Sequence, residues 1–200
     1  VGASAVNALS SHMQVVVKRD GKYHYQEYNI GQPKKPVAVI SEQQVLDLFP
    51  WEGKSFIKYD SGTLSSFIPD EKIFSTTEYK FKTIRDFLRE RAYLMAGLYF
   101  RIFNQAEGLR QDFYFEGGIK SMVRHLNRNK QVIHPVIHMK GEFEADKYKI
   151  LVEVAMQYTD AYSETMEMFA NTIKTPDGGT HLTGFRMALN RSLKDYAVKN

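Results

Sequence analysis

Positively charged residues recur at four-residue intervals near the end of the sequence. Arg186 and Lys194 are eight residues apart, with Asn190 midway between them and Arg191 beside it. Residues four apart lie on one side of an α-helix, so this spacing predicts a row of two positive charges and one amide. Such a row can contact phosphate groups, although a charged row is more often only the solvated side of a surface helix.

A second set of basic residues has the same spacing in the middle of the chain. Lys120, Arg124 and Arg128 lie four residues apart, beside the apolar positions Ile119 and Met122. In an amphipathic helix the apolar residues face a core and the charged residues face outward. Both segments therefore predict helices with one apolar side and one basic side.

Glycine near a helix start offers another kind of phosphate contact. Val1-Gly2 precedes a short predicted helix. The first backbone N–H groups of a helix have no partners within it and lie at the positive end of its dipole, where a phosphate can bind. Every helix start has such groups, so Gly2 becomes a candidate only with further evidence.

Helices and hairpins must position these candidate residues. Apolar positions three and four residues apart predict helices over 82–95 and 182–196. Asp20-Gly21 is a strong hairpin signal between strands 14–18 and 23–28. Other expected strands are 64–68, the hairpin pair 99–103 and 111–115, and 148–158 with 165–172 as its neighbour.

Composition limits the classes of protein to consider. The 200 residues are 43% hydrophobic and 25% charged, contain no cysteine and carry a formal net charge of +4. This is ordinary globular composition, and the mild positive charge permits a polyanionic partner without requiring one. Disulfides and thiolate metal sites are excluded, and no apolar run approaches the roughly 20 residues of a membrane helix. We expect a cytoplasmic protein with no membrane partner.

Signals for other chemistries are weak. His134 and His138 fall in a predicted loop and strand, not beside a glutamate on a helix, which argues against a zinc site. No Walker loop, dinucleotide-binding glycine motif or Gly-x-Ser-x-Gly motif occurs. Loop polarity explains Asp177 and His181 better than a catalytic triad does. We expect no catalytic residue and no metal ligand in this chain.

Three separated runs resemble bacterial DNA gyrase B subunits, in that family's order. They are 1–10 (Val-Gly-Ala-Ser-Ala-Val-Asn-Ala-Leu-Ser), 116–135 (Glu-Gly-Gly-Ile, then Leu-Asn-Arg-Asn-Lys and His-Pro) and 178–186 (Gly-Gly-Thr-His-Leu-Thr-Gly-Phe-Arg). The third run also resembles the related topoisomerase IV subunit, whereas the second favours gyrase. The resemblance spans nearly all of the chain except 37–59, which is longer than the family's equivalent loop and to which the sequence assigns no role.

The resemblance implies an α+β fold in two parts. Residues 1–115 would form the C-terminal part of a GHKL (Bergerat-type) ATPase domain, and residues 116–200 the N-terminal part of a transducer domain similar to domain 2 of ribosomal protein S5. The implied function of the full-length protein is ATP-dependent passage of one DNA duplex through another, with negative supercoiling. The implied cofactors are ATP and Mg²⁺. The residues that hold magnesium and hydrolyse ATP would lie outside this chain, so the chain alone is expected to be inactive.

The resemblance also assigns nucleotide-binding roles. Val1 and Gly2 match the end of a glycine-rich lid that closes over the ATP phosphates. Arg19 matches an arginine that flanks the adenine pocket, where coumarin-type inhibitors also bind. Thr63 matches a threonine that hydrogen-bonds near the adenine.

DNA contacts and partners follow from the same resemblance. Arg186 matches an arginine in the wall of the cavity that holds the transported duplex, and Lys194 lies in the same row. We extend this expectation to Lys120, Arg124 and Arg128. The implied partners are double-stranded DNA, a second copy of the chain in an ATP-gated dimer, and the gyrase A subunit in an A2B2 complex.

Two alternatives stay open. The first is the ATPase subunit of topoisomerase IV, the nearest competitor within the enzyme class. The second is a non-enzymatic nucleic-acid-binding module that uses the two basic helices. Such a module would bind DNA in a salt-sensitive way without any ATPase domain.

Overall fold

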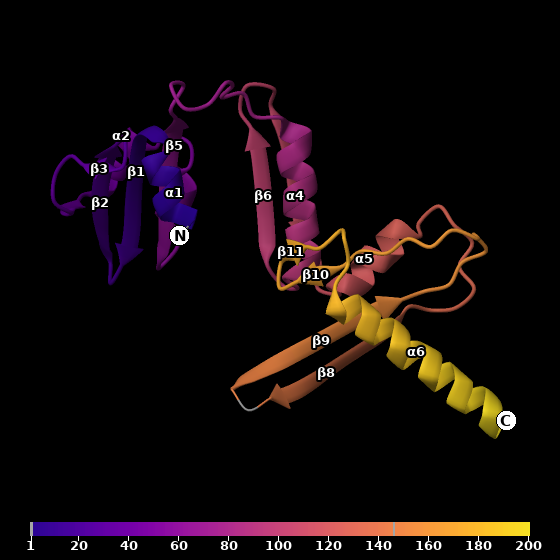
Figure 1. The fold of residues 1–200 in the computed structure, drawn as a ribbon. Helices are drawn as coiled ribbons and strands as arrows, with labels where there is room; N and C mark the ends of the chain where they lie inside the picture. The colour runs from indigo at the N-terminus through magenta and orange to yellow at the C-terminus, as the bar shows by residue number, and fades with distance from the viewer. Residues whose placement is uncertain (1, 146) are drawn as a thin grey trace. The chain divides into compact units, whose positions relative to one another are not determined.

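The computed structural model describes residues 2–145 and 147–200. The chain divides into two compact units, and the boundary in the sequence lies between Tyr79 and Lys80 (Figure 1). The first unit contains α1 (Gly2–Ala8), β1 (Ser10–Arg19), β2 (Lys22–Asn29), β3 (Gln32–Pro33), β4 (Ala38–Ile40), α2 (Glu42–Leu48), α3 (Gly53–Phe56) and β5 (Gly62–Pro69). The second contains α4 (Phe81–Leu94), β6 (Tyr99–Asn104), β7 (Leu109–Tyr114), α5 (Ile119–Leu126), β8 (Ile137–Ala145), β9 (Tyr148–Met156), β10 (Phe169–Ala170), β11 (Ile173–Lys174) and α6 (Thr180–Lys199). This mixture of helices and antiparallel strands confirms the α+β prediction.

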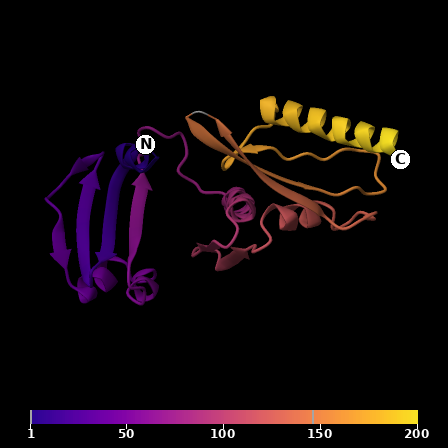
Figure 2. The same cartoon turned by 90° about the horizontal axis from the view of Figure 1, so that it is seen from below.

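An antiparallel sheet organises the first unit (Figure 2). Its strands follow the order β3-β2-β1-β5, and β4 also pairs with β2. The predicted hairpin between β1 and β2 is confirmed, and its turn has φ values of 51° at Asp20 and 71° at Gly21. Two-residue hairpin turns of this kind need positive φ at both positions, which Asp-Gly tolerates. The turn fixes the register that places Val16 opposite Tyr25.

The hydrophobic core of the first unit lies on one face of this sheet. Val16 and Val45 are fully buried there, together with Phe49 and Phe56. Helix α2 is held at its start by a capping box, in which Ser41 and Gln44 satisfy each other's backbone N–H groups. Residues 37–59, to which the sequence assigned no role, therefore form one wall of the core.

The core of the second unit joins α4, the β6–β7 hairpin and α5. Tyr93 stacks on Phe115 with ring centroids 3.9 Å apart. The His125 ring is tilted relative to the same tyrosine ring, with centroids 6.0 Å apart. This packing continues across residues 115 and 116, where the sequence placed a domain boundary. The division into compact units therefore differs from that boundary, and the assignment of 1–115 and 116–200 to two domains of the family stays a prediction.

The pairing expected for strand 148–158 is wrong. The partner of β9 is β8, in a hairpin whose register pairs Ile137 with Met156 and Phe143 with Ile150. Residues 165–172 contribute only the short strand β10, which pairs with β11. The residues of β8 alternate between apolar and polar types, as in a strand. The connection from β8 to β9 is also shorter than the connection from β9 to residues 165–172.

Helix α6 confirms the helix predicted over 182–196. Its N-cap is Gly179, which has a φ of 151°, a backbone conformation that glycine adopts more readily than other residues. Leu182, Phe185 and Leu189 are half-buried, whereas Tyr196 in the second half is 69% exposed. The apolar stripe is thus covered only near its start.

Candidate functional site

One face of the β1–β5 sheet brings two predicted nucleotide-binding residues together. Thr63 on β5 lies directly opposite Val17 on β1, so both side chains are on the same face. Arg19 follows two residues after Val17 and therefore shares this face, because side chains alternate along a strand. The neighbouring Val16 points to the opposite face, into the core. Arg19 and Thr63 thus lie on the sheet face that α2 and α3 leave open.

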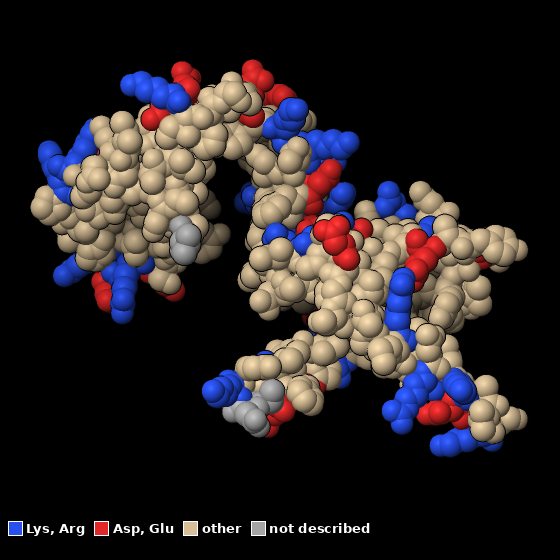
Figure 3. Space-filling view, viewed as in Figure 1, with Lys and Arg blue, Asp and Glu red and all other residues tan. Residues whose placement is uncertain are grey.

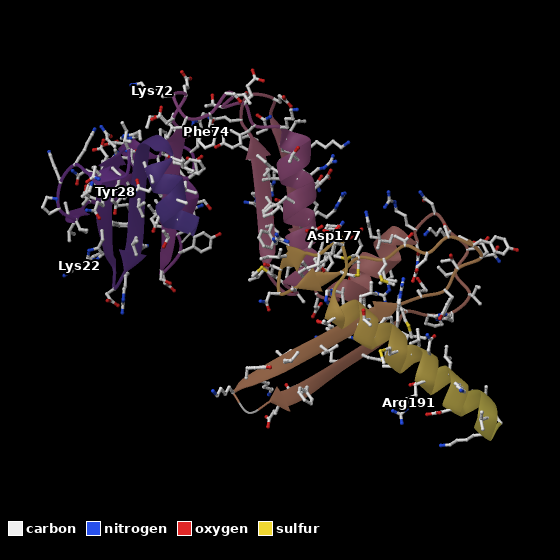
Figure 4. The ribbon with its side chains drawn as sticks, in the orientation of Figure 1. Lys22, Tyr28, Lys72, Phe74, Asp177 and Arg191 are labelled. Carbon is white, nitrogen blue, oxygen red and sulfur yellow. The ribbon has the colours of Figure 1, made fainter. Side chains whose placement is uncertain are left out.

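Helix α1 lies against the same face of the sheet. Ala5 and Val6 of α1 border an apolar hollow of about 270 Å³ together with Phe67, and Phe67 pairs with Met13 on the open face. Phe74, labelled in Figure 4, also lines this hollow. Gly2 is the first residue described in α1, so it lies in the helix and not just before it as expected. The prediction for Val1 falls outside the described residues.

The two side chains on the open face are available to a ligand. The Arg19 side chain is 79% exposed, and its Nε lies 3.6 Å from Asp20. An ion pair this exposed contributes little stability, so a ligand anion can displace the aspartate at small cost. Thr63 is also exposed, and within the described residues its hydroxyl forms no hydrogen bond. The sequence identified both residues only by resemblance, because their shared face depends on the strand register.

The first basic row is only partly helical. Lys120 and Arg124 lie in α5, as predicted, and Arg124 is exposed. The helix ends at Leu126, so Arg128 lies beyond its C-cap and does not extend the row along the helix. Its guanidinium group instead donates to the carbonyl oxygen of His125 at 3.0 Å. This carbonyl also accepts the backbone N–H of Arg128, so the side chain adds a second bond at the end of α5.

The second basic row lies on an exposed helix. Arg186 of α6 donates to the Glu164 carboxylate at 3.0 Å, and both side chains are more than half exposed. Arg191 projects from α6 in Figure 4, and Lys194 is also exposed. Figure 3 shows Lys and Arg side chains around the second half of this helix. The predicted basic side is therefore present, although Glu164 neutralises Arg186.

The described residues give no indication of a membrane segment or metal centre. None of the helices in residues 2–145 and 147–200 is long and apolar enough to cross a bilayer. In the same ranges, no three residues of the types that bind metals lie close enough to share an ion. His134 instead accepts the backbone N–H of Tyr158 at 3.0 Å, and His138 contacts Glu153 at 2.8 Å. These histidines stabilise the β9 region.

A charged cluster on the β6–β7 hairpin was missed by sequence reasoning. Asp112 accepts hydrogen bonds from Arg101 at 3.0 Å and from Arg110 at 2.6 Å. Arg110 is two residues from Asp112 on β7, and Arg101 is its cross-strand partner. The predicted hairpin contained this information, since residues opposite each other on one face interact. The pKa of Asp112 is lowered to about 2, and the largest cause is its hydrogen bonding with the Arg110 guanidinium group.

We expect the Asp112 carboxyl to titrate far below its ordinary value. Because its folded pKa lies below its unfolded value of 3.8, the stability that its charge provides is complete above about pH 4 and is lost as pH falls through about 2. The ¹³C chemical shift of the carboxyl carbon measures this directly. The Arg110→Gln variant should move the midpoint upward, and an unchanged midpoint would show that the Arg110 bond does not hold the charge.

Comparisons with known proteins agree along the chain. The DNA gyrase B family model matches residues 118–200. The DNA gyrase B protein of Thermotoga maritima is 42% identical over 204 aligned residues, which cover 100% of this chain and 30% of that protein. The chain thus spans about a third of the length of this relative.

Solved structures show the same fold. The 43K ATPase domain of Thermus thermophilus gyrase B, in complex with an aminocoumarin, superposes with a TM-score of 0.82 at 34% identity, over 99% of this chain and 50% of that one. The topoisomerase IV ATP-binding domain of Francisella tularensis superposes with a TM-score of 0.70 at 23% identity, over 98% and 49%. The second likeness concerns the fold alone.

Proposed function

Because this chain belongs to the DNA gyrase B family, we propose that it forms one wall of an ATP site and the first part of the transducer that relays ATP binding to DNA. One observation carries the proposal. Helix α1, Arg19 and Thr63 all lie on the sheet face opposite the hydrophobic core. Arg19 and Thr63 are exposed on this face, so a ligand can reach both side chains.

The proposed nucleotide contacts divide by chemistry. The backbone N–H of Gly2 would face the phosphates, and the space beside this residue is open, since even an added Cβ atom would meet nothing within 4 Å. We also propose a nucleotide contact for Val1, which lies outside the described residues. The Thr63 hydroxyl can donate to or accept from the adenine edge, directly or through water, and the Arg19 guanidinium can stack on a planar ring. The Thermus relative binds an aminocoumarin, and we place such an inhibitor near Arg19.

The remaining assignments concern the full-length protein. We assign residues 1–115 to a GHKL ATPase domain and residues 116–200 to a transducer domain. ATP and Mg²⁺ would act together in hydrolysis, and we place the magnesium ligands elsewhere in the protein, since no three groups of metal-binding types in the described residues lie close enough to share an ion. The proposed partners are double-stranded DNA, a second copy of the same polypeptide and the gyrase A subunit, and the proposed location is the cytoplasm.

The basic side of α6 is the proposed DNA contact. Arg186 and Lys194 would contact phosphates without reading sequence, and Lys120, Arg124 and Arg128 would contribute from the α5 region. Glu164 would compete with DNA for Arg186, because the guanidinium donates to this carboxylate in the absence of DNA. Displacement of so exposed a carboxylate costs little free energy.

We expect Arg186→Glu in the full-length protein to lower the apparent affinity for duplex DNA on the order of tenfold, because it replaces a phosphate contact with a repulsive charge. The measurement is ATP hydrolysis as a function of DNA concentration. Nucleotide affinity should change little, since Arg186 is not on the open sheet face. The matched variant Glu164→Gln should have the opposite effect and strengthen stimulation by DNA. Unaltered stimulation in Arg186→Glu would contradict this DNA contact.

The same experiment addresses the two alternatives. A non-enzymatic nucleic-acid-binding module would bind DNA with equal salt dependence but show no coupling to ATP hydrolysis. Topoisomerase IV would show the coupling but relax DNA and not supercoil it. A supercoiling assay with the gyrase A subunit therefore distinguishes the enzymes.

A further inference from the structure

The second unit contains a polar hollow that neither the ATP proposal nor the DNA proposal uses. It has a volume of about 430 Å³ and lies between α4, β7 and α5. Arg85, Arg89 and Tyr93 line it from one side of α4 at intervals of four residues. Gln111 of β7 and His125 of α5 border it from the other elements. Side chains able to hydrogen-bond thus border one open hollow from three elements.

Positive charge is in excess around the hollow. Arg85 and Arg89 both donate to one oxygen of Asp86, at 2.8 Å and 3.0 Å, so a single carboxylate opposes two guanidinium groups. Asp112 also lines the hollow, but both of its oxygens are occupied by arginines of the β6–β7 hairpin. A further guanidinium, from Arg128, reaches the His125 ring at 2.8 Å. An anion that enters meets more positive than negative charge.

Two uncharged groups complete the hollow. Tyr93 is 4% exposed, and its hydroxyl forms no hydrogen bond with any residue in the described ranges. The hydroxyl oxygen itself is not fully buried and borders the hollow, so it can donate a hydrogen bond to a ligand there. Because a guanidinium group can only donate, Nε2 of His125 accepts the bond from Arg128, and the ring is neutral. Burial and the nearby arginines lower the pKa of His125, in agreement with this state.

We propose that this hollow binds a phosphate monoester or free phosphate, with Arg85 and Arg89 contacting the anion and the hydroxyl of Tyr93 donating to it. Two guanidinium groups from adjacent helical turns match the oxygen atoms of a phosphate dianion. The site is concave, and its arginine side chains are only 32–33% exposed, compared with 86% for Arg191 of α6. A small ligand can reach these partly covered guanidinium groups more easily than a rigid duplex can. This site would be separate from the ATP-facing sheet.

Inorganic phosphate is the probe, added to the full-length protein that contains this chain. NMR signals of the Nε–H groups of Arg85 and Arg89 and of the Gln111 amide report on this hollow alone, so binding at the ATP site does not interfere. We expect saturable shifts with a dissociation constant on the order of 1 mM, and no such shifts with chloride at equal ionic strength. Adenosine monophosphate and a 20-base-pair duplex test the source of the phosphate.

Variants separate binding from folding. Arg89→Gln should weaken phosphate binding about tenfold, Arg89→Lys should retain part of it, and Arg191→Gln, which lies outside the hollow, should not change it. Tighter binding of the monophosphate than of free phosphate would identify a nucleotide as the ligand and support the proposal. Absence of saturation with both, equal binding by Arg89→Gln, or shifts with the duplex alone would overturn it.

Discussion

Replacing Phe49 with alanine is expected to destabilise the first unit by about 3–5 kcal/mol, the usual cost of removing a buried phenylalanine. Phe49 is 5% exposed and packs in the core with Val16, Val45 and Phe56. The substitution would leave a cavity between the sheet and the 37–59 segment. Urea unfolding followed by circular dichroism would show a lower midpoint for the first of the two units.

Trp51→Ala is the matched control for this prediction. Trp51 lies two residues away in the same segment but is 68% exposed, so its loss should change the free energy of unfolding by less than about 0.5 kcal/mol. Equal and small effects of the two substitutions would show that residues 37–59 are a loop that the core does not need.

Replacing Gly118 with alanine is the second prediction of a large effect. Gly118 is the N-cap of α5 and has φ 53° and ψ −132°, a backbone conformation that residues with a side chain rarely adopt. A Cβ atom would also lie 3.2 Å from Cβ of Ala96. We expect a loss of about 1–3 kcal/mol, or more if α4 must shift. Thermal unfolding and hydrogen exchange across α5 measure it.

Gly141→Ala provides the comparison. Gly141 lies in β8 without a positive φ, and an added Cβ would meet nothing within 4 Å. Alanine there should be neutral or stabilising, because it restricts the unfolded chain. If Gly118→Ala were as well tolerated as Gly141→Ala, Gly118 of the Glu-Gly-Gly-Ile motif would have no conformational role.

Local signals in the sequence predicted much of the fold. Asp20-Gly21 determined a hairpin because the turn type needs residues that accept positive φ, and apolar spacing predicted α4 and α6. The pairing of β8 with β9 was missed because alternation shows that a strand exists but not which neighbour it selects. The packing of Val45, Phe49 and Phe56 from residues 37–59 into the core was missed for a related reason. A packing role depends on contacts that are distant in sequence.

The sequence predicted less of the candidate site than of the fold. Arg19 and Thr63 were named by resemblance, whereas their common face follows from the register of β1 with β5. Arg128 was placed in a helical row because spacing alone cannot show where a helix ends. The polar hollow between α4, β7 and α5 was not predicted, since its residues come from three elements that meet only in the folded unit.

The crystal structure of the full-length protein with a non-hydrolysable ATP analogue is the most direct measurement. The adenine should lie beside Thr63 and Arg19, on the sheet face that α2 and α3 leave open, with the phosphates toward the start of α1. A nucleotide bound on the opposite face, or bound elsewhere with Arg19 and Thr63 still in solvent, would contradict the proposed ATP wall.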